Sequence, residues 1–103
     1  MNDINDLIKL AESGDASAQL DLGLCYQEGK GVEKNYEIAV EYFKKAAAQG
    51  FVFAYCFLGL CYEIGRGVKQ SDEIAFEYYK KQQTEEMLVH KKNWVIFIKQ
   101  EEE

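Results

Sequence analysis

The sequence predicts an all-α fold made of two copies of a 36-residue helix-turn-helix unit, with a further helix at each end. Three observations predict it. A long stretch of sequence recurs at a fixed offset, apolar residues recur at helical spacing, and glycines fall where helices should end. The 103 residues include no proline and only 8 glycines, whereas a chain with many turns and strands usually contains more of both.

The repeat is visible in two stretches that align without a gap. LGLCYQEGKGV occupies residues 22–32 and LGLCYEIGRGV occupies residues 58–68, an offset of 36 residues. When residues 11–45 are aligned with residues 47–81, 18 of the 35 positions are identical. Chance would give only a few matches, so we interpret the stretches as copies of one unit.

Each copy shows the start and stop signals of two helices. Asp15 and Asn35 are expected to cap the two helices of copy one, and Gly29 and Gly50 to end them, because glycine readily adopts positive φ. The apolar positions between these signals have helical spacing: Ala18, Leu22 and Tyr26, then Ile38, Ala39, Tyr42, Phe43 and Ala46. Copy two repeats the pattern with Gly65, Gly67 and Asp72. Small residues should let the helices approach closely, namely Ala18, Gly23, Ala39, Ala54, Gly59 and Ala75.

The pattern A-x-x-G-x-x-x-A-x-x-x-L-G-x-x-Y-x-x-G-x-G-V, followed by A-x-x-Y-[FY]-K-K-A, resembles the Sel-one-like repeats (SLR), which are related to tetratricopeptide repeats. The resemblance covers about residues 7–83. It implies an α/α solenoid whose members act as adaptors and scaffolds for protein complexes.

A third copy is not evident, because His90, Trp94 and Val95 stand where its alanine and its Leu-Gly pair would fall. Residues 84–100 still suit a helix, and we favour that over a single unpartnered strand at WVIFI. We therefore divide one domain, residues 1–103, into an N-terminal helix (3–13), repeat one (15–50), repeat two (51–83) and a degenerate terminal helix (84–100).

Charge and composition narrow the class of partner. The formal net charge is −6 and the pI about 4.8, which disfavours nucleic acid. No apolar run is long enough to span a membrane, which needs about 20 residues. The start of the chain has no secretory pattern, and an odd number of cysteines argues for a reducing compartment. We expect a cytoplasmic protein.

Catalytic chemistry is not expected, and neither is a cofactor or a metal. His90 is the one histidine and has no evident catalytic partner. Cys56 and Cys61 lie about 140° apart around one helix, so they do not converge on a metal. We expect the thiols of Cys25, Cys56 and Cys61 to be reduced and mostly buried. Some bacterial SLR proteins have a disulfide between a cysteine at the position of Cys56 and another nine positions earlier. Here Ala47 stands at that earlier position, so the bridge cannot form.

The first helix differs most between the copies, where Asp15, Ala16, Ser17, Gln19 and Asp21 become Phe51, Val52, Phe53, Tyr55 and Phe57. Residues 84–100 could pack over this patch, which we favour for Phe51, Val52 and Tyr55. A protein partner could contact it instead. The resemblance implies that a concave surface runs along the first helices, and we predict that a partner contacts Leu24, Gln27, Glu28, Phe53, Leu60, Glu63 and Ile64.

Three functions fit these features. The first is an adaptor or scaffold that binds a protein through the concave face. The second is a small acidic inhibitor, such as an immunity protein that neutralises a basic toxin. The third is a self-associating structural module, because two repeats are fewer than the three or so that a stable solenoid usually needs.

Overall fold

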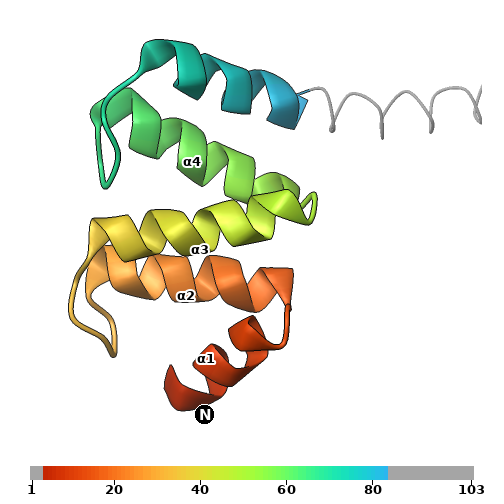
Figure 1. Ribbon diagram of the computed structural model, residues 1–103, viewed down its shortest axis with the longest axis vertical. Coiled ribbons are helices and arrows are strands. Elements are labelled where there is room, and N and C mark those ends of the chain that lie inside the picture. Colours follow the sequence, from red (N-terminus) through yellow and green to blue (C-terminus); the bar gives the residue numbers. More distant parts are fainter. Residues whose placement is uncertain (1–3, 84–103) are drawn as a thin grey trace, which may run out of the picture.

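The computed structural model describes residues 4–83, which form a stack of antiparallel helices (Figure 1). The helices are α1 (Ile4–Glu12), α2 (Ala16–Glu28), α3 (Tyr36–Ala48) and α4 (Val52–Ile64), followed by a helical segment at 72–83. No strand occurs in this range, and the predicted all-α fold is confirmed there. The predicted terminal helix at residues 84–100 lies outside the described residues.

Side-chain caps fix where three of the helices begin. The Asp15 carboxylate accepts a hydrogen bond from the Ala18 amide at 2.8 Å, and the Asn35 side chain accepts one from Ile38 at 3.1 Å, as predicted. In repeat two, the Ser71 hydroxyl accepts from the Ile74 amide at 3.2 Å. The assignment of this role to Asp72 is therefore wrong. Ser71 is the residue that the 36-residue offset places opposite Asn35.

Glycines end the first helix of each repeat in the left-handed region. Gly29 has φ 72° and Gly65 has φ 71°. In each case the next amide, that of Lys30 or Arg66, donates to a carbonyl of the last helical turn at 2.8 Å. This is the geometry that glycine permits at little cost, so the predicted helix stops are confirmed.

Within each repeat, the two helices meet where a glycine faces an aromatic ring. A Cβ atom built on Gly23 would lie 2.6 Å from the ring of Phe43, and one built on Gly59 would lie 2.6 Å from the ring of Tyr79. Neither position has room for a side chain. The small residues predicted to allow close approach therefore do so.

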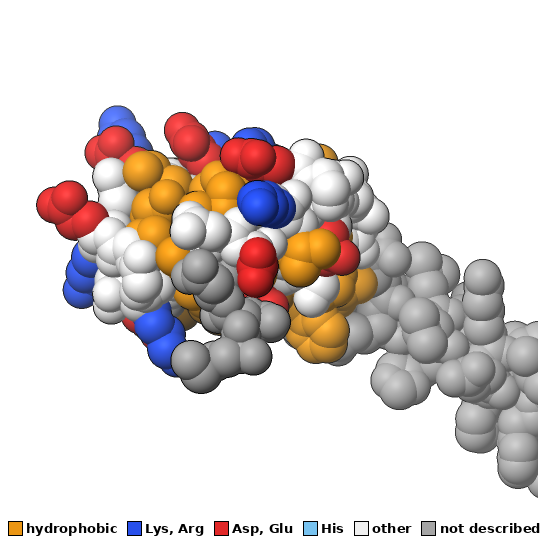
Figure 2. All heavy atoms as spheres, turned by 90° about the horizontal axis from the view of Figure 1, so that it is seen from below, with side chains coloured by type: hydrophobic (Ala, Val, Ile, Leu, Met, Phe, Trp, Pro, Cys, Tyr) orange, Lys and Arg blue, Asp and Glu red, His pale blue; other side chains and the backbone are white. Residues whose placement is uncertain are grey.

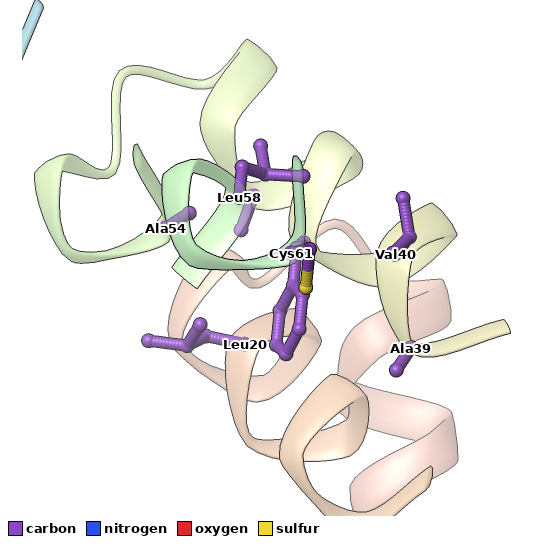
Figure 3. Close-up of a cluster of buried hydrophobic side chains, with 8 residues drawn as sticks. Leu20, Ala39, Val40, Ala54, Leu58 and Cys61 are labelled. Atoms are coloured by element: carbon purple, nitrogen blue, oxygen red, sulfur yellow. The ribbon is translucent and has the colours of Figure 1, made fainter. Parts of the chain in front are cut away.

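The central cluster joins the two repeats and contains Leu20, Ala39, Val40, Phe43, Ala46, Ala54, Leu58 and Cys61 (Figure 3). The ring of Phe43 is fully buried and stacks on Phe57 of the next repeat at 5.5 Å. Full burial of a side chain of this kind contributes about 1.5–3 kcal/mol. A smaller cluster of Ala11, Ala18 and Leu22 attaches α1.

One buried amide links three helices at the other end of repeat one. The Gln19 side chain donates to the Ala11 carbonyl at 3.1 Å and accepts from the Gln49 amide at 2.9 Å. Gln19 is buried, and both halves of its amide have a partner. This network fixes the end of α1 and the end of α3 against α2.

The two Gly-x-Gly-Val loops lie on the same side of the stack, and each packs on the preceding repeat or helix (Figure 1). Gly67 has φ 76°, and a Cβ atom on it would lie 2.4 Å from the carbonyl oxygen of Tyr36. Gly31 faces Ile4 of α1 in the same way, but a Cβ atom built on Gly31 would lie 3.4 Å from the Cβ atom of Ile4, which leaves more room. The second glycine of the motif thus lets one repeat contact the next.

We predict that Gly67→Ala destabilises the fold much more than Gly50→Ala. Gly50 also has positive φ, 80°, but a Cβ atom there would meet nothing within 4 Å. Gly50→Ala should therefore cost only the backbone strain, about 1–2 kcal/mol. Gly67→Ala should cost about 1–3 kcal/mol more, because backbone atoms must move. Urea unfolding of both variants measures the difference, and equal losses would contradict the loop contact.

Candidate functional site

The seven residues predicted to contact a partner lie on two helices and, by helical spacing, on one face of each: Leu24, Gln27 and Glu28 on α2, and Phe53, Leu60, Glu63 and Ile64 on α4. We call this set the inner face. On α4, Phe53 is 64% exposed, Ile64 49% and Leu60 40%, and Glu63 is exposed beside them. The α4 part of the inner face therefore presents large apolar groups to solvent.

The α2 part of the inner face is more covered. Leu24 is half-buried and packs against the central cluster, and Gln27 is also half-buried. Glu28, at the end of the helix, is exposed. Leu24 thus contributes to the core between the repeats, and partner contact through this set stays a prediction.

Four of the five changed positions at the start of α4 are at least partly buried. Tyr55 is buried, with its ring 6.4 Å from that of Tyr78 and the Lys81 ammonium 5.0 Å above it. Phe57 stacks on Phe43 as described above. The segment at 72–83 therefore covers Tyr55, while residues 84–100, which we expected to cover it, lie outside the described residues.

The remaining changed residues surround Phe53. Phe51 and Val52 are half-buried, and the Phe51 ring meets the Phe53 ring edge-on at 5.6 Å between centroids. Phe51 stands at the helix start without making the side-chain cap that Asp15 makes in repeat one. Of the five changed side chains, Phe53 is the one that remains exposed.

Glu63 supplies negative charge at the edge of the apolar part. The Tyr79 hydroxyl donates to its carboxylate at 3.4 Å. Burial raises the pKa of Tyr79, and the Glu63 carboxylate raises that pKa further. The neutral phenol is thereby favoured, which keeps it a hydrogen-bond donor to Glu63.

Two aromatic features of the described surface were missed by the sequence reasoning. Two cations lie near the ring of Tyr36, the Lys34 ammonium and the Arg66 guanidinium, each 4.9 Å from its centroid. Phe76 is exposed on the segment at 72–83. The alignment contains a signal for Phe76, because it replaces Val40 at an otherwise well-matched stretch.

The thiols are free but differ in burial. Cys61 is buried and Cys25 is half-buried, as expected for residues at equivalent positions. Cys56 is exposed, so the prediction of mostly buried thiols is wrong for it. The reason is its place on α4, where residues 4–83 contain no further repeat to cover it. Burial raises the pKa of the Cys61 thiol, with a smaller opposing effect of Arg66.

Hollows of similar size occur in both repeats, between the Gly-x-Gly-Val loop and the second helix. The one in repeat two is about 530 Å³ and the one in repeat one about 450 Å³. Their linings correspond residue for residue: Tyr62, Val68, Lys69, Gln70, Ser71 and Ile74 against Tyr26, Val32, Glu33, Lys34, Asn35 and Ile38. Because both copies have it, the hollow is a feature of the repeat rather than a specific ligand site.

Potential metal ligands do not form a cluster in the described part of the chain. Within residues 4–83, no three His, Cys, Asp or Glu side chains come together in a way that could hold a metal ion. His90 lies outside the described residues. Within residues 4–83, no helix has both the length and the apolar character needed to cross a bilayer.

Figure 2 shows the α1 end of the molecule, where apolar patches lie among acidic and basic side chains.

Comparison with known sequences gives the family. The sequence model of the Sel1 repeat matches residues 16–51 and again residues 52–81, which together are more than half of the chain. The chain belongs to the Sel1 repeat family. Proteins of this family are in general modules for protein–protein interaction without catalytic groups of their own.

Solved structures of Sel1 repeat proteins share the fold. A Sel1 repeat protein from Oxalobacter formigenes superposes with a TM-score of 0.76 over 80% of this chain and 62% of its own, at 36% identity. A protective antigen of uropathogenic Escherichia coli, which displays an SLR fold, gives a TM-score of 0.80 over 82% of this chain and 18% of its own, at 39% identity. The helix stack is therefore an SLR solenoid.

A curated relative is much longer. The rat (Rattus norvegicus) protein named DAP3-binding cell death enhancer 1 is 42% identical over 40 residues, which are 39% of this chain and 8% of the rat protein. The present chain thus spans less than a tenth of that relative. The likeness concerns the repeat and leaves the rest of the rat protein unmatched.

We predict that Cys61 is the slowest of the three thiols to be alkylated in the native protein. Its side chain is buried, and its raised pKa reduces the fraction of reactive thiolate. A pulse of iodoacetamide followed by peptide mass spectrometry measures each cysteine separately, and the unfolded chain in urea serves as the control. Labelling of native Cys61 as fast as Cys56 would contradict the packing described here.

Proposed function

We propose that this chain is a non-catalytic module that holds a partner polypeptide against the inner face. The observation that carries the proposal is the exposure of Phe53, Leu60 and Ile64 along one face of α4. Phe53 and Ile64 are 11 positions apart, which is about 16 Å along a helix. Exposed apolar side chains grouped in this way are typical of recognition surfaces.

The comparison of the two repeats supports a role in binding for Phe53 and Ile64. At the equivalent positions of repeat one, Ser17 and Glu28 stand in place of Phe53 and Ile64. Repeat one folds with polar groups there, so apolar groups are not required by the architecture. A role in binding explains why repeat two differs.

Charge indicates what kind of partner fits. Glu28 and Glu63 are exposed at the ends of α2 and α4, and the whole chain carries a net charge of −6. A segment with apolar side chains flanked by Lys or Arg would match both features. The rat relative is itself named for binding another protein, which agrees with this class of function.

We expect a photo-crosslinking residue at Phe53 to capture a partner in cells, whereas the same residue at Glu41 should not. Glu41 is exposed on α3, away from the inner face, and so serves as the matched control. Mass spectrometry of the product names the partner. Equal capture of the same protein from both positions would contradict binding at the inner face.

We predict that Phe53→Ala plus Ile64→Ala weakens binding of the captured partner at least tenfold, chiefly through faster dissociation. Loss of buried apolar area acts mainly on the dissociation rate. Surface plasmon resonance measures both rates. Since both side chains are largely exposed, the melting temperature should change little. A large loss of stability with binding intact would show that they belong to the core.

We further predict that Glu28→Lys plus Glu63→Lys slows association, most strongly at low salt. Long-range attraction between acidic residues and a basic partner raises the association rate and is screened by ions. The measurement is the association rate against ionic strength. An association rate that is unchanged at low salt would exclude a basic partner. It would not contradict the apolar contact, which the Phe53→Ala plus Ile64→Ala variant tests separately.

A further inference from the structure

Repeat two ends in an apolar surface that is distinct from the inner face. It consists of Cys56 and Leu60 on α4 and Phe76 on the segment at 72–83, and we call it the end face. All three side chains are exposed, Phe76 at 65%. Leu60 lies on the border and belongs to both surfaces.

The duplication shows what covers such a surface. The equivalents of these three residues in repeat one are Leu20, Leu24 and Val40. Leu20 is 8% exposed and Val40 3%, while Leu24 is half-buried. All three pack in or against the central cluster, to which α4 contributes Ala54, Leu58 and Cys61 (Figure 3). In repeat one, this surface is therefore covered by the first helix of the next unit.

We propose that residues 84–100 pack on the end face in the way that α4 packs on repeat one. The 36-residue offset that relates the repeats carries Val52–Ile64 of α4 onto residues 88–100. By the same offset, residues 49–51, which form the turn after α3, correspond to residues 85–87. The chain outside the described residues thus begins at the right place and has the right length.

The composition of residues 84–100 fits this position. Met87, Trp94 and Phe97 fall where Phe51, Leu58 and Cys61 lie, which are three of the five side chains of residues 51–64 that pack in or against the cluster. His90 and Asn93 fall where the other two, Ala54 and Phe57, lie. Lys92 and Lys99 fall on the positions of Cys56 and Glu63, which face outward on α4. In the proposed arrangement, the side chains turned toward the end face would thus include the apolar Met87, Trp94 and Phe97.

Several packed positions of α4 hold a different kind of residue in this segment, including Lys91 in place of the buried Tyr55. Val95 replaces Gly59, whose missing side chain makes room for the ring of Tyr79 in the helix that follows α4. That requirement comes from the following helix and not from the end face. His90 replaces the fully buried Ala54 and is larger, so the proposed docking requires a wider spacing than that between α4 and repeat one.

This docking leaves most of the inner face open. Ser17 and Glu28 remain exposed although α4 packs on repeat one, and they are the equivalents of Phe53 and Ile64. The two proposals share Leu60, but they are tested separately, because this one is tested at Phe76 and the proposed function at Phe53 and Ile64.

Trp94 is the single tryptophan of the chain and reports on the contact directly. In the 103-residue chain we expect blue-shifted Trp94 emission that is protected from acrylamide. Phe76→Lys should shift the emission to that of the urea-unfolded chain and remove the protection. Phe53→Lys is the matched control: it adds the same charge to an equally exposed Phe, and the emission should stay blue-shifted.

Circular dichroism should show that residues 4–83 still fold in both variants, since each replaced ring is largely exposed. Emission of the unaltered protein equal to that of the unfolded chain would overturn the proposal. So would an equal effect of the two substitutions. Protection that disappears on dilution would overturn it too, because a second copy of the chain would then be the occupant of the end face.

Discussion

The contact between a glycine and an aromatic ring inside each repeat is the constraint on which the rest of the structure depends. Because Gly23 has no side chain, the ring of Phe43 reaches the backbone of α2 and becomes fully buried. The same ring then stacks on Phe57 of the next repeat. One missing side chain thus sets both the spacing within repeat one and the contact between repeats.

The same constraint has a different outcome in repeat two. Gly59 admits the ring of Tyr79, but that ring is only half-buried and its hydroxyl reaches Glu63 near the surface. The difference follows from position: a second repeat lies over Phe43, whereas the described residues place none over Tyr79. The sequence of each repeat thus determines the contact between its glycine and its aromatic ring, whereas the neighbouring repeat determines how deeply that ring is buried.

The contrast between contacts within a repeat and burial by neighbouring helices explains which parts of the structure could be predicted from the sequence. The helices, the caps at Asp15 and Asn35 and the glycine stops follow from local and periodic signals, and they were predicted. The inner face was placed on α2 and α4 from the family resemblance, but how much of it is exposed was not predictable. Exposure of Cys56 and coverage of Tyr55 depend on which helix lies beside α4, and no local pattern encodes that.

The divergence of the two copies separates changes that serve packing from changes that do not. Tyr55 and Phe57 replace polar residues and are packed against Tyr78 and Phe43, so they contribute to folding. Phe53 replaces a serine and leaves most of its ring in water. Burial of a Phe side chain contributes about 1.5–3 kcal/mol, and folding captures little of this at Phe53. A partner that covered the ring would gain most of it, which corresponds to about tenfold or more in affinity before the costs of association.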